Sequence, residues 1–140
     1  KKDYNMSLFV DANVFLRFLL VDHTTQSRAA HALFIQAKSG KIHLVTHSIV
    51  IAEIIFTLSS FYELPKLEII EKIKIILLFE GLEILEKNIL LQSISFYEKK
   101  NIDFIDAFIA AYAYKNKIDV CSFDKDFDKV KEIKRVSPLI

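Results

Sequence analysis

Five short segments of the chain are apolar, or alternate between apolar and polar residues, and are too short for helices. Such runs of four to eight residues, rich in Val, Ile, Leu and Phe, are typical of β-strands buried in a sheet. The pattern therefore predicts strands at SLFV, ending at Asp11, and at KIHLVTH (41–47), LEILE (82–86), IDVCSF (118–123) and IKRVSPL (133–139), the last halted by Pro138.

The longer segments between these strands carry apolar residues at helical spacing. Gly40 and Gly81 each follow one of these segments, and Pro65 falls in a first turn, where proline is well tolerated. The pattern predicts helices at residues 13–20, from Thr24 or Thr25 to 38, and at 48–62, 63–79, 88–100 and 101–116, and a short helix at 124–130. Asn101 is a candidate cap for the helix at 101–116.

Strands that alternate with helices imply right-handed crossovers and parallel pairing. We therefore expect an α/β fold, a three-layer α/β/α sandwich with a mainly parallel central sheet. A content of 52% hydrophobic residues supplies a core, and a length of 140 residues predicts one domain over residues 1–140. Lys1–Asn5 are interpreted as a leader or an added segment, because Met6 precedes the first strand as a native start would.

Charge and cysteine usage narrow the possible classes of protein only a little. The net charge is +1, so no overall field favours nucleic acid, although most basic residues lie after residue 60. The single cysteine, Cys121, fits a reducing cytoplasm. The sequence contains no convincing secretory signal, and no apolar run is long enough for a membrane span, so we expect a cytoplasmic protein without a membrane partner.

Two acidic residues in the first half of the chain are candidates for chemistry. Asp11 directly follows a predicted strand, and ligands of open α/β sheets bind beyond the carboxyl ends of strands. A cap for the following helix would explain Asp11 equally well. Glu53 is flanked by Ile49, Val50 and Phe56 on an otherwise apolar helix face, where a buried carboxylate would need a cation or a raised pKa. The alternative is a glutamate at the edge of the buried stripe that reaches water.

Further acidic candidates lie in the second half. Asp103 and Asp106 share one face of the helix predicted at 101–116, and like charges at that spacing repel unless a cation lies between them. Asp103 falls in the first turn, where the helix dipole would explain it. Asp106 is expected one turn deeper, beyond that effect. Small residues below Asp106 would let this helix approach the sheet closely.

Asp124 follows the strand IDVCSF as Asp11 follows SLFV. A helix cap would also explain it, and we interpret Asp126 and Asp128 as ordinary first-turn acids. Ser122 could donate a hydrogen bond that orients a carboxylate or a water.

Several types of site are absent. No Cys/His set has zinc spacing, the two glycines cannot build a phosphate loop, and the chain contains no G-x-S-x-G motif. Carboxylates without these motifs favour hard divalent cations. The sequence therefore predicts a carboxylate metal site.

Four segments, in this order, make the chain resemble the PIN domain family, and within it the VapC-type toxins of toxin–antitoxin pairs: FVDANVFLRFLL, VIAEIIFTL, DFIDAFIAAYA and CSFDKDFDKV. By position, the resemblance assigns the catalytic and metal-binding acids to Asp11, Glu53, Asp106 and Asp124. It gives supporting roles to Asp103, Asn13 and Ser122.

The resemblance implies an endoribonuclease with one or two Mg²⁺ or Mn²⁺ ions, and raised pKa values in the empty site. Substrate phosphates would be steered by the C-terminal lysines and Arg135. The expected partners are an RNA substrate, a cognate antitoxin and a second copy of the chain. The helices at 48–62 and 65–79 have more apolar surface than a small sheet needs to cover, which favours an interface there.

Three alternatives remain open. A HAD-type phosphatase needs a second aspartate where this chain has Asn13. A PIN-fold nuclease could instead serve RNA processing or decay, or cut structured DNA. A non-catalytic binding module of the same fold would have no reason to keep repelling carboxylates together.

Overall fold

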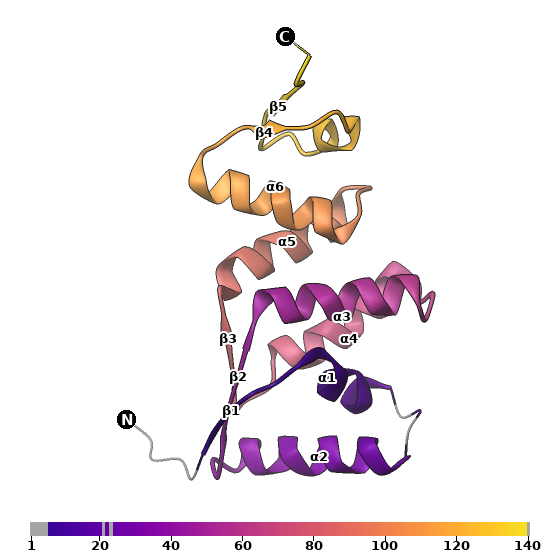
Figure 1. Ribbon diagram of the computed structural model, residues 1–140, viewed down its shortest axis with the longest axis vertical. Coiled ribbons are helices and arrows are strands. Elements are labelled where there is room, and N and C mark those ends of the chain that lie inside the picture. The colour runs from indigo at the N-terminus through magenta and orange to yellow at the C-terminus, as the bar shows by residue number, and fades with distance from the viewer. Residues whose placement is uncertain (1–5, 21, 23, 140) are drawn as a thin grey trace. The chain divides into compact units, whose positions relative to one another are not determined.

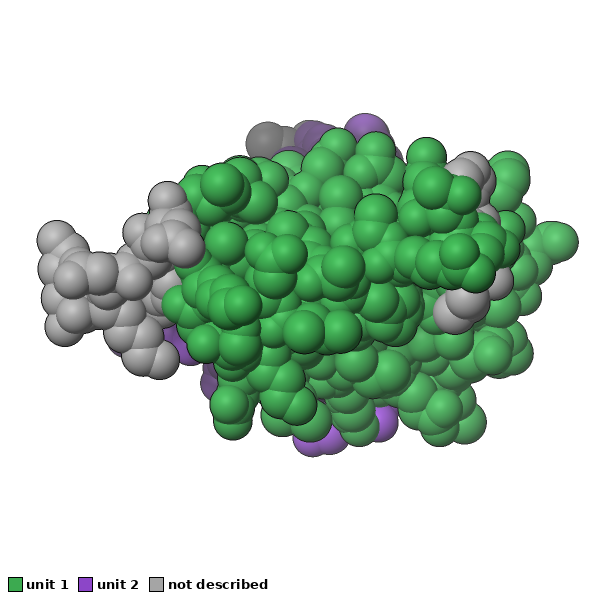
Figure 2. Space-filling view, turned by 90° about the horizontal axis from the view of Figure 1, so that it is seen from below, with its two compact units in different colours: residues 1–85 green, residues 86–140 purple. Residues whose placement is uncertain are grey.

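The computed structural model describes residues 6–20, 22 and 24–139 of the chain. The chain forms two compact units, residues 1–85 (unit 1) and residues 86–140 (unit 2), which Figure 2 draws in different colours. Each unit is described here by itself. The segment Lys1–Asn5, interpreted above as a leader or an added segment, lies outside the described residues.

Unit 1 contains a three-stranded parallel sheet in the order β1-β2-β3 (Figure 1). The strands span Ser7–Phe9, His43–His47 and Leu82–Leu85. Leu8 pairs with Leu44, which in turn pairs with Leu82. Side chains alternate between the two faces of a strand, and accordingly Leu44 and Thr46 are fully buried while their neighbours in β2 are partly exposed.

Four helices complete unit 1: α1 (Ala12–Leu19), α2 (Thr24–Lys38), α3 (Ser48–Ser60) and α4 (Lys66–Leu77). Their buried faces follow the helical spacing of the sequence, with Ile51, Ile54, Ile55 and Leu58 of α3 at or below 2% exposure. A group of aromatic rings joins α1 and α2 to the end of α4. Phe34 contacts Phe18 at 4.4 Å and Phe79 at 5.1 Å between ring centroids.

Gly81 joins the end of the α4 region to β3 in a conformation that only glycine adopts easily. Its φ is +98°, and a Cβ at this position would collide with the backbone carbonyl of Ala37 in α2. The absence of a side chain at residue 81 therefore permits the close approach of α2 to the start of β3.

Unit 2 contains α5 (Lys87–Lys99), α6 (Phe104–Asn116), β4 (Val120–Cys121), the 3₁₀ helix η1 (Lys125–Lys129) and β5 (Arg135–Val136). β4 and β5 pair in parallel, with Val120 opposite Arg135. The helix α6 packs mainly on α5. Ala107, Ala110 and Ala111 are fully buried, as is Ser93 of α5. Small residues were expected to bring this helix close to the sheet; Ala110 and Ala113 are buried, but the main packing partner of α6 is α5.

The α/β class and the parallel pairing of strands are as expected, and the hydrogen bonds divide the strands between one sheet in each unit. The last two strands are much shorter than predicted. The predicted helix at 101–116 begins only at Phe104, which changes the positions of its acidic residues. No helix within residues 6–139, setting aside positions 21 and 23, has the length and apolar character needed to cross a membrane.

Candidate metal centre

Three aspartates of unit 2 form a cluster of carboxylates. Asp106, Asp124 and Asp126 each offer an oxygen that lies within 4.8 Å of the other two. Asp106 comes from α6, whereas Asp124 and Asp126 come from the start of η1. The structure therefore brings together two of the acids expected from the sequence and adds a third.

The start of α6 differs from expectation. Asp103 is its N-cap residue, although its side chain makes no capping hydrogen bond, and Asp106 lies in the first turn. The expectation that Asp106 lies a turn deeper was wrong, because the helix begins at Phe104 and not near Asn101. The helix N-terminus therefore favours a negative charge at Asp106.

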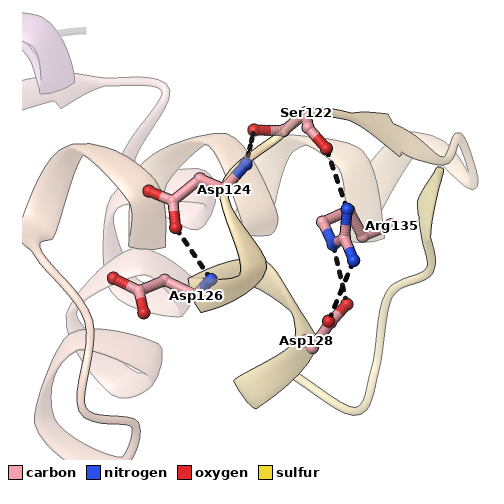
Figure 3. Close-up of polar contacts among 5 residues, drawn as sticks. All are labelled: Ser122, Asp124, Asp126, Asp128 and Arg135. Atoms are coloured by element: carbon pink, nitrogen blue, oxygen red, sulfur yellow. Dashed lines mark hydrogen bonds and ion pairs between the residues drawn. The ribbon is translucent and has the colours of Figure 1, made fainter. Parts of the chain in front are cut away.

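Asp124 is held by two hydrogen bonds, one through its backbone N–H and one through its carboxylate (Figure 3). Its N–H donates to Ser122 Oγ at 2.9 Å, and its Oδ1 accepts from the N–H of Asp126 at 2.8 Å. Ser122 thus acts on Asp124, but as an acceptor from the backbone and not as the expected donor to a carboxylate. The second bond caps η1 and also brings the carboxylates of residues 124 and 126 together.

Asp126 is the site residue that the sequence interpretation missed, since it was assigned to the helix dipole. Its carboxylate forms an ion pair with Lys129 Nζ at 3.0 Å. The same Nζ donates to the carbonyl of Asn101 at 2.9 Å, which ties η1 to the segment before α6. The available signal was the Asp-x-Asp spacing at a strand end, because a side chain that bonds the backbone two residues on forms a tight turn.

The cluster perturbs the ionisation of Asp106. Burial raises the pKa of Asp106 above its ordinary value of 3.8, and the charges of Asp124, Asp103 and Asp126 raise it further. All these effects disfavour the carboxylate form. The direction at Asp106 is the one expected of a carboxylate crowded by other acids.

The three carboxylates fit a hard divalent cation. Mg²⁺ binds oxygen at about 2.0–2.1 Å, so two oxygens on opposite sides of one ion lie up to about 4.2 Å apart. Adjacent ligands of an octahedral ion lie only about 2.9 Å apart, so oxygens within 4.8 Å of one another would close in on a bound cation by up to about 2 Å. A cation there would also remove the repulsion that raises the pKa of Asp106.

Asp11, in unit 1, lies at the junction between β1 and α1. It is the N-cap of α1 and its Oδ1 accepts from the N–H of Ala12 at 2.7 Å, while the residue itself is exposed. The buried Thr46 hydroxyl donates to the carbonyl of Val10 at 2.9 Å and so fixes the chain just before Asp11. Asn13 is exposed and lines a groove of about 580 Å³ between α1 and α2.

Glu53 lies on an exposed face of α3. Its neighbours Ile49 and Phe56 are 68% and 58% exposed, and the glutamate is exposed as well. The apolar surroundings are as expected, but the expectation that burial makes the carboxylate costly was wrong, because this face of α3 points away from the core of unit 1. The roles of Asp11 and Glu53 in one site with the acids of unit 2 remain a prediction.

Arg135 was expected to contact phosphates, but its guanidinium is engaged within unit 2. It forms a fork with both carboxylate oxygens of Asp128, at 2.9 and 3.2 Å. This bond to Arg135 lowers the pKa of Asp128 and raises that of Arg135. Asp128 therefore belongs to a separate ion pair and not to the acidic cluster.

Comparison with known proteins identifies the family. A model of the family described as "PIN domain" matches residues 8–133. Among solved structures, the chain is similar to VapBC2 from Rickettsia felis, solved bound to a DNA fragment from its promoter, at 14% identity and a TM-score of 0.40. That likeness covers 94% of this chain and 98% of the other. A search of curated proteins gave no match. Because the family model spans nearly the whole chain, this protein belongs to the PIN domain family.

Proposed function

We propose that this protein is a Mg²⁺- or Mn²⁺-dependent endoribonuclease. The observation that carries the proposal is the gathering of Asp106, Asp124 and Asp126 in a chain of the PIN domain family. A structure that holds repelling carboxylates together, and raises the pKa of one of them, gains stability when a cation binds between them.

Each residue has a defined part in this proposal. Asp106, Asp124 and Asp126 would hold the cation, which when bound supplies an activated water and stabilises the leaving oxygen of the phosphodiester. Asp11 and Glu53 complete the metal-binding set, as the sequence resemblance implies. Asp103 adds negative charge beside Asp106, Asn13 supports Asp11, and Ser122 fixes the backbone of Asp124.

RNA is the proposed substrate. The segment that carries Asp124 also bears Lys125, Lys131 and Lys134, all of which are exposed. Lysines near a cluster of carboxylates can attract a phosphate backbone without entering the metal centre. Arg135 is omitted from this set because Asp128 engages its guanidinium.

We further propose that the protein is the toxin of a VapBC-type pair, acting in the cytoplasm and held by an antitoxin encoded beside it. The resemblance of the four sequence segments to VapC-type toxins supports this role. It favours a toxin over a PIN-fold nuclease of RNA processing or decay, and over a non-catalytic module.

A homodimer is proposed through α4. The apolar residues of this helix divide into two sets in the structure. Ile69, Ile70, Ile73 and Ile76 are buried within unit 1, whereas Leu67, Ile75 and Leu78 are 71%, 52% and 81% exposed. Part of the expected excess surface is therefore core, and the remainder is available for a partner.

Cleavage of a structured RNA tests the activity. We expect cleavage with Mg²⁺ or Mn²⁺, none with EDTA, and none by Asp106→Asn under any of these conditions. Asp119→Asn, an exposed aspartate outside the cluster, is the matched control and should cleave as the wild type does. Co-expression with the product of the adjacent gene should yield a complex that does not cleave. Cleavage that persists in EDTA, or in Asp106→Asn, would overturn the proposal.

A further inference from the structure

Arg135 joins three segments of unit 2 through one guanidinium (Figure 3). From β5, its Nε and Nη2 donate to Asp128 in η1, and its Nη1 donates to the carbonyl of Ser122, at the end of β4, at 3.0 Å. Its side chain is only 15% exposed, compared with 52% for Asp128. The guanidinium is therefore committed to contacts within the unit and largely withdrawn from solvent.

The two residues that Arg135 contacts, Ser122 and Asp128, lie on either side of Asp124 and Asp126 in the sequence. Ser122 precedes Asp124 and Asp128 follows Asp126, so the guanidinium closes the segment 122–128 at both ends. The Ser122 hydroxyl also accepts from the N–H of Asp124, which places that N–H next to one of the clamped ends. Asp124 and Asp126 thus lie in a short segment whose two ends are both bonded to the side chain of Arg135.

Packing alone holds this segment weakly. Phe127 is 4% exposed and anchors one side, but Phe123 is 69% exposed, and Asp124 is exposed as well. Carboxylates that repel one another will separate unless the backbone that carries them is restrained. Arg135 suits this task, because its planar guanidinium forms several hydrogen bonds in a fixed geometry, which a lysine ammonium does not.

We propose that Arg135 is a positioning residue, paired with Asp128, which holds Asp124 and Asp126 in the arrangement that binds a divalent cation. The proposal rests on the function proposed above. It differs from the expectation that Arg135 contacts substrate phosphates, because donors from all three guanidinium nitrogens are bonded to Asp128 and Ser122. Residues that orient metal ligands without touching the metal typically alter its affinity by about 10–100-fold.

Mn²⁺ binding, measured by calorimetry on the full chain, tests this role without depending on catalysis. Arg135→Lys and Asp128→Asn should each weaken Mn²⁺ binding by about 10–100-fold. The double variant should bind Mn²⁺ no more weakly than the more strongly affected single variant does, because both changes break the same contact. Asp128→Glu, which retains the charge, should restore part of the affinity.

The control is Glu132→Gln. Glu132 lies in the same C-terminal region, but its ion pair, at 3.3 Å, is with Lys100 and not with Arg135 or Asp128. Mn²⁺ binding should therefore be unchanged. Circular dichroism establishes that each variant is folded. If Arg135→Lys does not fold, Asp128→Asn carries the test, since Arg135 there keeps its bond to the Ser122 carbonyl.

Binding of an RNA oligonucleotide to the same variants in EDTA separates the two roles of Arg135. Wild-type Mn²⁺ affinity in Arg135→Lys, combined with weaker RNA binding, would overturn the positioning role and identify a phosphate contact. That result would leave the proposed nuclease intact. A wild-type protein that neither binds Mn²⁺ nor cleaves RNA would instead overturn the proposed function, and the positioning role with it.

Discussion

Asp106 and Asp124 place carboxylate oxygens within 4.8 Å of each other, although one lies in the first turn of α6 and the other caps η1. Two like charges at this separation are unfavourable, and the charge of Asp124 contributes to the raised pKa of Asp106. The folded chain therefore maintains an electrostatic strain that a cation would relieve.

Replacement of Asp106 by Asn should stabilise the metal-free protein at neutral pH. The pKa of Asp106 is higher in the folded chain than its ordinary value of 3.8. The free energy of unfolding therefore falls as the pH rises from 3.8 to the pKa of the folded state, and it stays lower at every higher pH. We expect a gain of roughly 0.2–1 kcal/mol, reduced by solvent screening. Thermal unfolding as a function of pH measures it, and the gain should vanish below about pH 3.8, where wild-type Asp106 is protonated in both states. A destabilised variant at pH 7 would contradict this prediction.

Divalent cations should stabilise the protein by mass action. At a hundredfold excess over the dissociation constant, Mg²⁺ or Mn²⁺ should add about 2.7 kcal/mol to the free energy of unfolding. Melting temperature measured against metal concentration tests this, with Asp124→Asn as the variant that should lose the response. A wild-type melting curve indifferent to both Mg²⁺ and Mn²⁺ would argue strongly against the metal centre.

Asp126 should contribute to metal affinity. Asp126→Asn removes one of the three carboxylates, and we expect Mn²⁺ binding to weaken at least about tenfold. This change also breaks the ion pair with Lys129, so Lys129→Gln is the matched control. That control should bind Mn²⁺ as tightly as the wild type or more tightly, because it removes a competing cation. Equal weakening in both variants would show that the ion pair, and not the carboxylate, is responsible.

Substitution of Gly81 should destabilise unit 1. Ala at this position would adopt a φ of +98° and collide with the carbonyl of Ala37, so Gly81→Ala should cost about 1–3 kcal/mol or more. Gly40 also has a positive φ, of +82°, but a Cβ there would meet nothing within 4 Å. Gly40→Ala should therefore cost less in urea unfolding. Equal costs for the two substitutions would show that the close approach at Gly81 has no energetic importance.

The proposed dimer predicts a specific effect on oligomeric state. Leu78→Lys should convert a dimer to a monomer in light scattering, because Leu78 is 81% exposed on the face of α4 assigned to the interface. Ile35→Lys, at an apolar position of α2 that is 68% exposed, is the control and should leave the dimer intact. A wild-type protein that is monomeric at high concentration would exclude this interface without affecting the nuclease proposal.

The sequence by itself determined the order and type of the elements, because hydrophobic periodicity is a local property. It placed Asp11 at the junction of a strand and a helix and Asp106 on a helix, although one turn too deep, and its motifs identified the family. Tertiary structure decided what those side chains contact. Asp126 and Asp128 lie two residues apart and look alike in the sequence, yet one joins the cluster with Asp106 and the other pairs with Arg135. The Asp-x-Asp spacing indicates a tight turn, but which acid joins the cluster and which joins the ion pair depends on where α6 and β5 pack against η1. The exposure of Glu53 likewise depended on which face of α3 packs into the core, because both of its faces are apolar.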